Sequence, residues 1–179
     1  MKSLLYPDDY ISSIYDADIK KLYEEGYRGI IFDVDNTLVP HNAPADDRAK
    51  AFFSELNELG FQSLLLSNNK EPRVKTFQEA SGASAYIFKA NKPSVKGYEM
   101  AMEKMGTTKE NTLFVGDQIF TDIWGANRAG IRTIMVKPVL KWKEEIQIIL
   151  KRLVEAFILL GYKHYVKKGG EVRKVPMKK

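Results

Sequence analysis

Two aspartates follow a short run of apolar residues early in the chain. Residues 29–32 read Gly-Ile-Ile-Phe, and Asp33 and Asp35 come directly after them. Such a run is typical of a buried strand, and open α/β sheets place their ligands beyond the carboxyl ends of their strands. Side chains two positions apart on a strand point the same way, so both carboxylates are expected to face one crevice. Two like charges held this closely require a cation, a shared proton or a reaction. A polar turn after a strand is the alternative interpretation.

Three further polar motifs follow in the sequence, at 67–69, 91–93 and 116–122. The first and third come directly after apolar runs, so they too are expected at strand ends. An acidic crevice is expected where Asp117 and Asp122 meet Asp33, and it would repel phosphate unless a cation lies in it. A set of ligands that consists of oxygen atoms only, with no His or Cys, favours Mg²⁺. Ser67 and the backbone at Asn68 are candidates to hold phosphoryl oxygens, with helix capping as the alternative.

The four motifs, in this order, resemble those of the haloacid dehalogenase (HAD) superfamily of hydrolases. The resemblance extends from Ile30 to about Val136, which is most of the chain. The Leu-Leu-Tyr-Pro start at 4–7 and the Gly-Asp-Gln-x-x-Thr-Asp form at 116–122 further resemble subclass III phosphatases of the YqeG type. That group is similar to the phosphatidylglycerophosphate phosphatases.

Phosphoryl transfer needs a nucleophile, a means of spreading negative charge and a proton for the leaving group. Asp33 fits a nucleophile that forms an aspartyl-phosphate, and Asp35 fits the general acid/base; the resemblance implies the same roles. It also implies that Asp33 and Asp117 bind Mg²⁺ through carboxylates and that Asp35 binds it through its backbone carbonyl. Asp122 is either a direct ligand or the partner of a bound water, with a helix-terminus residue as the alternative. Lys92 would neutralise charge on Asp33 and the phosphate, unless it is an ordinary surface lysine.

Strand and helix patterns alternate along the chain, which predicts a doubly wound parallel α/β sheet. The resemblance implies five strands in the spatial order 3-2-1-4-5, with the Asp33 strand central. Residues 1–28 are expected to form short packing helices. Expected strands lie at 29–34, 61–66, 85–88, 112–115 and 131–136. Expected helices lie at 44–59, 71–80, 93–105 and 121–129.

The spacing between motifs leaves no room for a cap domain. Residues 37–67 leave room for one loop and one helix, and residues 67–92 leave room for one helix and one short strand. An uncapped site is open, which suits a phosphate on a large or surface-bound molecule. The alternative is that a second subunit of an oligomer supplies a lid for the site.

The basic character of the chain lies at its C-terminal end. The 179 residues carry a net charge of +5, of which residues 141–179 contribute +7 and the rest −2. We therefore divide the chain into a catalytic domain at 1–140 and an amphipathic helix with a basic, flexible tail at 141–179. The helix is expected at 142–161, flanked by Trp142. Its apolar stripe comprises Ile146, Ile149, Leu150, Leu153, Phe157 and Leu160, widened by Ile148, Val154 and Ile158.

Composition excludes several classes of protein. The chain has no cysteine, hence neither disulfides nor thiolate chemistry. Residues 1–25 lack the apolar core of a secretory signal, and no apolar run approaches the roughly 20 residues of a membrane span. A cytoplasmic location is the expectation.

The sequence thus predicts a Mg²⁺-dependent phosphomonoester hydrolase, with phosphatidylglycerophosphate as the favoured substrate. The amphipathic helix would place the open site at an anionic membrane surface; burial of the same helix against the sheet or in a dimer is the alternative. One rival is a phosphatase for a soluble sugar phosphate or nucleotide. A second rival is a ribosomal RNA-binding module that uses the basic tail, and the full set of catalytic residues argues against it.

Overall fold

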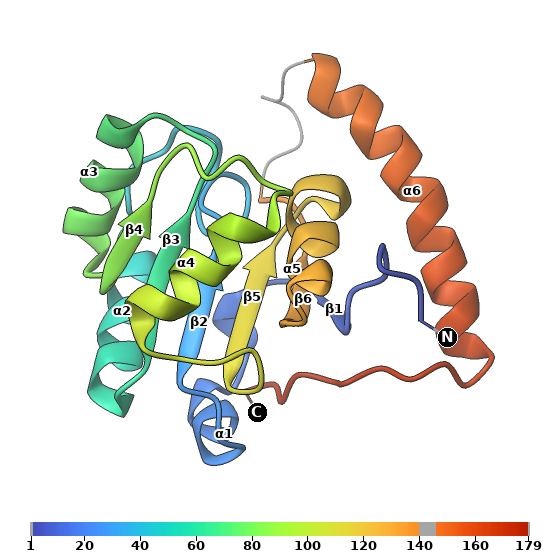
Figure 1. Cartoon of the computed structure of the whole chain (residues 1–179), viewed down its shortest axis with the longest axis horizontal. Coiled ribbons are helices and arrows are strands. Elements are labelled where there is room, and N and C mark those ends of the chain that lie inside the picture. The colour runs from blue at the N-terminus through green and yellow to red at the C-terminus, as the bar shows by residue number, and fades with distance from the viewer. Residues whose placement is uncertain (1, 140–145, 179) are drawn as a thin grey trace.

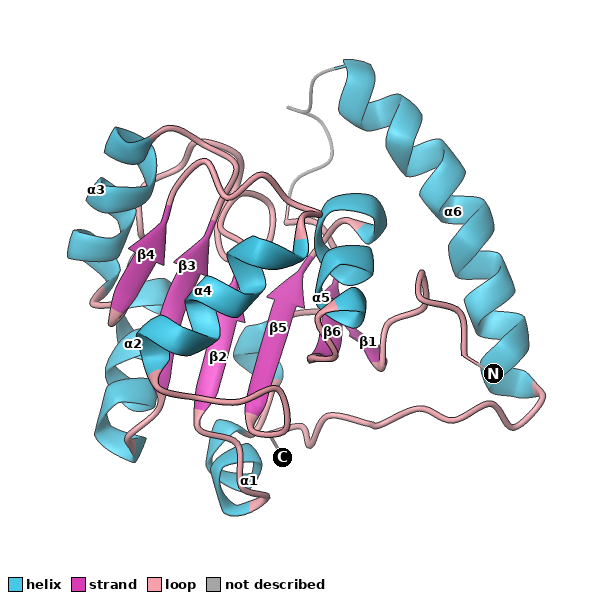
Figure 2. Cartoon of the chain, in the orientation of Figure 1, coloured by secondary structure: helices cyan, strands magenta, loops and turns pink. Residues whose placement is uncertain are grey.

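A six-stranded parallel sheet forms the centre of the molecule (Figures 1 and 2). The computed structural model describes residues 2–139 and 146–178. The spatial order is β1-β6-β5-β2-β3-β4, so the predicted order of the five strands from residue 29 onward is confirmed, and β2 lies between β3 and β5. The strands are β1 (Asp9–Ile11), β2 (Gly29–Phe32), β3 (Gln62–Leu66), β4 (Ala85–Ile87), β5 (Thr112–Gly116) and β6 (Arg132–Val136).

Helices connect the strands close to where they are expected. They are η1 (Ile14–Asp16, 3₁₀), α1 (Ile19–Glu24), α2 (Asp47–Leu59), α3 (Glu71–Ser81), α4 (Val95–Met105), η2 (Ile119–Ile123, π), α5 (Trp124–Arg128) and α6 (Ile146–Lys167). Helix α2 begins later than the expected residue 44 because the Asp46 side chain caps it, accepting a hydrogen bond from the Ala49 N–H at 2.8 Å. The helix expected at 121–129 instead begins as the π-helical turn η2.

Alternate residues of each strand enter separate apolar cores on the two faces of the sheet. In β2, Ile30 and Phe32 pack in the cluster that includes buried residues of α1, α2 and α3. Ile31 points to the other face and packs with residues of α4 and α5. Since β2 is buried on both faces, its last residues are fixed in register, and the chain leaves the strand at a defined place and angle.

The N-terminal segment contributes a strand that the sequence did not predict. Residues Asp9–Ile11 were expected in a helix, but they form β1 and pair in parallel with β6 at the sheet edge. The Asp8 carboxylate accepts a hydrogen bond from the Thr133 N–H at 2.9 Å and so fixes the entry of the strand. Three residues are too few for an alternating pattern to show in the sequence. The sequence therefore predicted five strands, whereas the sheet has six.

The C-terminal segment beyond α6 packs along the body. The expectation of a flexible tail is wrong for residues 173–178: the Val175 N–H donates to Asp9 Oδ2 at 2.6 Å, and the Lys178 N–H donates to the Asp16 carbonyl at 2.8 Å. The Arg132 guanidinium donates to the Arg173 carbonyl at 2.7 Å. Figure 1 shows this segment returning from the far end of α6 towards α1. We call residues 173–178 the C-terminal strap.

The connections around the carboxyl ends of the strands are short. Between Thr37 and Lys92, a stretch that is described throughout, the chain forms only α2, β3, α3, β4 and their loops. No additional domain covers this edge from that stretch. Among the described residues, no helix combines the length and apolarity that crossing a bilayer requires.

The packing of the strap on the body leads to a prediction about stability. Val175 is 5 % exposed, so Val175→Ala should lower the free energy of unfolding by about 1–2 kcal/mol through lost burial and a small cavity. Lys174→Ala, at the exposed neighbouring position, should change it little. Urea denaturation followed by circular dichroism compares the two variants. Equal stabilities would show that the strap does not pack on the body in solution.

Candidate active site

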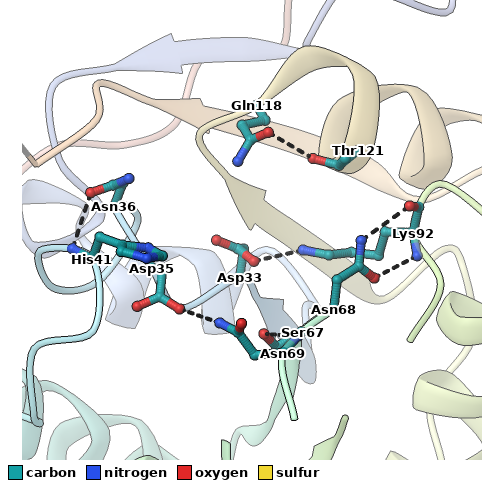
Figure 3. A pocket seen from close by; sticks show the side chains of 10 residues that line it. All are labelled: Asp33, Asp35, Asn36, His41, Ser67, Asn68, Asn69, Lys92, Gln118 and Thr121. Carbon is teal, nitrogen blue, oxygen red and sulfur yellow. Dashed lines mark hydrogen bonds and ion pairs between the residues drawn. The ribbon is translucent and has the colours of Figure 1, made fainter. Parts of the chain in front are cut away.

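The predicted site residues converge at the carboxyl ends of three neighbouring strands. Asp33 follows β2, Ser67 follows β3 and Asp117 follows β5. A pocket of about 220 Å³ opens there (Figure 3). It is lined by Asp33, Asp35, Asn36, His41, Ser67, Asn68, Asn69, Lys92, Gln118 and Thr121.

A buried cluster of carboxylates includes Asp33, which lines this pocket. Asp33, Asp117 and Asp122 each offer an oxygen within 4.8 Å of the other two. Lys92 Nζ lies between two of them, 2.6 Å from Asp33 Oδ1 and 2.7 Å from Asp122 Oδ1. All four residues are buried, so Lys92 is not an ordinary surface lysine, and its ammonium is the counter-charge for the cluster.

Burial and like charge shift the acid–base properties of the cluster. Burial raises the pKa of Asp33; Lys92 opposes this shift, and Asp122 and Asp117 add to it. Burial also raises the pKa of Asp117, with Asp122 adding to the shift and Arg152 opposing it. Burial alone would lower the pKa of Lys92, but the Asp122 and Asp33 carboxylates hold it above its ordinary value. The cluster therefore favours an additional positive charge.

Three contacts set the position of Asp122: one of packing and two hydrogen bonds. A Cβ on Gly116 would come within 2.6 Å of Asp122 Oδ2, so only glycine at the end of β5 leaves room for that carboxylate. The Gln118 N–H donates to the same oxygen at 3.0 Å. From the other side, the Tyr98 hydroxyl of α4 donates to the Thr121 carbonyl at 2.8 Å and holds η2. Held in this way, the π-helical turn places Asp122 Oδ1 2.7 Å from Lys92 Nζ.

Asp35 lies on the pocket wall, apart from the buried cluster. Its carboxylate accepts hydrogen bonds from the Asn42 N–H at 2.7 Å, Asn69 Nδ2 at 2.5 Å and the Arg73 guanidinium at 2.8 Å. Figure 3 shows it directed at Asn69. Asn69 and Arg73 were not assigned a role from the sequence; the signal available is that Asn69 is the last residue of the 67–69 motif and Arg73 lies in the first turn of α3, directly after it.

The remaining predicted residues position the loops. Asn68 Oδ1 accepts the Lys92 N–H at 2.7 Å, and Asn68 Nδ2 donates to the Lys92 carbonyl at 3.2 Å, so the side chain of Asn68 clamps the Lys92 backbone (Figure 3). Ser67 Oγ accepts the Asn69 N–H at 3.2 Å and lines the pocket. Thr37 Oγ1 lies 3.1 Å from Asp117 Oδ1 and 3.3 Å from Asp33 Oδ2, bridging the loops after β2 and β5.

Helix α6 also reaches the site, which the sequence analysis did not predict. The Arg152 guanidinium forms an ion pair with Asp117 Oδ2 and donates to the Asp117 carbonyl at 3.2 Å. Glu155 Oε1 accepts the Ile119 N–H at 2.6 Å, at the start of η2. Both residues lie in a segment that was assigned to an appendage, and no motif spacing connects them to the site.

The carboxylate cluster fits a divalent cation. Its donors are oxygens only and three carboxylates converge, and burial, with neighbouring carboxylates adding to it, raises the pKa of both Asp33 and Asp117. Hard cations such as Mg²⁺ select donors of this kind.

The fold and the motifs match known proteins of one class. Residues 89–145 match a family model described as HAD-hydrolase-like. A Vibrio cholerae structure, provisionally assigned as a 3-deoxy-D-manno-octulosonate 8-phosphate phosphatase, superposes with a TM-score of 0.53 at 16% identity, covering 69% of this chain and 74% of that one. With its central parallel strands and connecting helices, the molecule has the fold of the HAD-type phosphatases.

Proteins that are similar in sequence identify the family within this class. The chain is 41% identical over 140 residues to "Probable phosphatase YqeG" of Bacillus subtilis, covering 78% of this chain and 81% of the relative. It is also 25% identical over 178 residues to phosphatidylglycerophosphate phosphatase 1 of Arabidopsis thaliana, covering 94% of this chain and spanning 50% of that protein. The chain belongs to the YqeG-like phosphatases of the HAD superfamily.

Lys92 provides a test of the cluster. Lys92→Met removes the ammonium and leaves an unbranched side chain one atom shorter, so Asp33 and Asp122 stay buried without their cation. We expect the free energy of unfolding in metal-free buffer to fall by about 3–5 kcal/mol. Lys96→Met, at an exposed position on α4, is the matched control and should be close to wild type. Equal midpoints of urea denaturation for both variants would contradict the arrangement.

Proposed function

We propose that the protein is a Mg²⁺-dependent phosphomonoester hydrolase that acts through an aspartyl-phosphate on Asp33. The observation that carries this proposal is the position of the Asp33 carboxylate. It lines the pocket, is held 2.6 Å from Lys92 Nζ, and has two further carboxylates behind it. A carboxylate fixed in this way can attack a phosphorus atom that enters from the pocket.

The reaction has two displacement steps. In the first, an Asp33 oxygen bonds to phosphorus, the bond from phosphorus to the ester oxygen breaks, and Asp35 gives a proton to the leaving alkoxide. In the second, Asp35 takes a proton from water, the water oxygen bonds to phosphorus, and the bond to Asp33 breaks to release inorganic phosphate. Lys92 stays charged throughout and offsets the negative charge of Asp33 and of the phosphoryl oxygens, while Ser67 and the backbone at Asn68 hold those oxygens.

The cation would be held by the carboxylates of Asp33, Asp117 and Asp122 together with the backbone carbonyl of Asp35. When bound, Mg²⁺ supplies charge neutralisation for the phosphate and the carboxylates. Asp122 contacts Lys92 directly and belongs to the cluster, which supports its inclusion.

Asn69 and Arg73 act on Asp35 as positioning residues. They hold its carboxylate at the pocket wall, 2.5 Å and 2.8 Å from their donor atoms, while Asp33 stays in the buried cluster. The two aspartates therefore remain separate, as a nucleophile and a proton carrier must. Arg73 also orients the carboxylate without entering the pocket lining.

The favoured substrate is phosphatidylglycerophosphate. The Arabidopsis relative carries that activity in its name, although this chain spans only half of it. The uncapped pocket suits a phosphate presented by a surface. A sugar phosphate or nucleotide remains the competing substrate class, and the test below separates the two.

A surface beside the pocket supports contact with an anionic membrane. Leu153, Val154, Phe157 and Leu160 form an exposed apolar patch on α6; Phe157 is 75% exposed. We call these four residues the α6 patch. The opposite side of the helix packs on the body, where Ile158 and Leu159 join Leu5 and Tyr10. Trp142 lies outside the described residues, as do the side chains of residues 146–151.

Exposed lysines continue the same surface towards the strap, among them Lys163, Lys167 and Lys168. An apolar face bordered by basic residues is the usual form of a helix that lies in a lipid interface. Because Arg152, next to the α6 patch, contacts Asp117, a bilayer on the patch would adjoin the pocket. We therefore propose that residues 141–179 work as an orienting element for the catalytic domain at 1–140.

The nucleophile is tested by Asp33→Asn. An amide is a poor nucleophile, so hydrolysis of p-nitrophenyl phosphate should fall by at least about a thousandfold, while the circular dichroism spectrum stays native. In wild type, acid-quenched mass spectrometry during turnover should find a phosphate on the peptide that contains residue 33. Near-normal turnover by the variant would overturn the mechanism.

The substrate and membrane assignments are tested together with vesicles. The intact protein should sediment with phosphatidylglycerol vesicles more than with phosphatidylcholine vesicles, and less so as salt rises. It should hydrolyse phosphatidylglycerophosphate in the anionic vesicles. Phe157→Ser should reduce both effects, whereas Phe88→Ser, a matched change at an exposed phenylalanine beyond β4, should not.

Two results would overturn these assignments separately. Faster turnover of sugar phosphates or nucleotides than of the lipid would remove the substrate proposal and keep the phosphatase. Absence of vesicle binding would remove the membrane proposal. If light scattering then showed a dimer that Phe157→Ser dissociates, the patch would be a subunit interface.

A further inference from the structure

Arg152 is the second cation that contacts the carboxylate cluster, and it comes from outside the catalytic motifs. Its guanidinium forms an ion pair with Asp117 Oδ2, while Lys92 Nζ binds Asp33 and Asp122. The Arg152 side chain is 14% exposed and that of Asp117 is fully buried, so solvent screens the pair little. Arg152 thus supplies positive charge at the one cluster carboxylate that Lys92 does not reach.

This contact and a bound cation compete for one carboxylate. Arg152 binds Asp117 Oδ2, and a divalent cation held by Asp33, Asp117 and Asp122 needs an oxygen of the same side chain. Asp117 Oδ1 already lies 3.1 Å from Thr37 Oγ1, so Oδ2 is the oxygen for which the two compete.

Arg152 also has a second carboxylate within reach. Glu155 Oε2 lies 3.8 Å from Arg152 Nη1, one turn along the same helix. Glu155 is buried and accepts a hydrogen bond from the Ile119 N–H at 2.6 Å, so it has an anchor on the body that does not involve Arg152. A guanidinium that leaves Asp117 therefore keeps a partner of opposite charge and is not stranded.

We propose that Arg152 is a positioning residue of the active site, which holds Asp117 in the cation-free protein and moves to Glu155 when the divalent cation binds. This inference rests on the proposed metal site. Arg152 then sets the affinity of the site for the cation, because binding must break the ion pair with Asp117. It also connects α6, and the α6 patch beside Arg152, to occupancy of the site.

The test measures Mg²⁺ affinity of the full chain by isothermal titration calorimetry. Arg152→Gln should bind Mg²⁺ about tenfold more tightly than wild type, a coupling of ordinary size between two sites. Lys163→Gln is the matched control, since it removes one positive charge from an exposed position on the same helix and should leave the affinity unchanged. Asp117→Asn should lose most of the affinity.

A second measurement uses the wild-type chain and does not depend on any variant folding. Arginine residues are modified with phenylglyoxal, and the extent at each position is read by peptide mass spectrometry. Saturating Mg²⁺ should increase modification of Arg152, because the cation frees it from Asp117. Arg132, which is buried against the strap, serves as the internal reference and should not change.

The outcomes separate the two proposals. If Asp117→Asn loses Mg²⁺ but Arg152→Gln binds it like wild type, Arg152 does not compete and this inference falls while the metal site stands. An equal gain in Lys163→Gln, or unchanged modification of Arg152 at saturating Mg²⁺, overturns it as well. If Asp117→Asn binds Mg²⁺ like wild type, the metal site itself is wrong and this inference falls with it.

Discussion

Three carboxylates buried within 4.8 Å of one another are the constraint on which the rest of this molecule depends. Like charges at that distance, removed from water, oppose folding unless positive charge reaches them. Lys92 provides it for Asp33 and Asp122, and Arg152 provides it for Asp117. Each cation comes from a part of the chain distant from its partners, so the site holds together only when the whole domain is folded.

Rigid elements of the fold hold these charged groups in place. Strand β2 is buried on both faces, Gly116 leaves space for the Asp122 carboxylate, and Tyr98 holds η2 in its π-helical form. The Asn68 side chain fixes the backbone of Lys92 through two hydrogen bonds. Because these supports are packed or hydrogen-bonded, the charged groups are positioned before any substrate arrives, and that preorganisation is what phosphoryl transfer chiefly requires.

The sequence predicted the parts of the structure that rest on local patterns. The strands from residue 29 onward, and the gathering of Asp33, Ser67 and Asp117 at one edge, follow from apolar runs that end in polar motifs; the strand order and the place of Lys92 were implied by the family resemblance. Strand β1 and the strap were missed because a strand of three residues and a basic terminal segment carry no periodic signal; their structure comes from pairing with distant residues. Arg152 was missed for the same reason: on the helix it is an ordinary polar residue, and only the packing of α6 shows its partner.

Helix α6 is attached to the body on both sides. Upstream, the Val139 N–H donates to the Asn36 carbonyl at 2.9 Å; downstream, the strap bonds to residues near the N-terminus. A helix tethered at two points stays at a high effective concentration over the site even when its own contacts break. Loss of the Arg152 contact therefore allows a small local displacement and fast return, and the helix does not diffuse away. Proteolysis within the strap would remove one tether and lower this effective concentration, so that a helix displaced from the site would return more slowly.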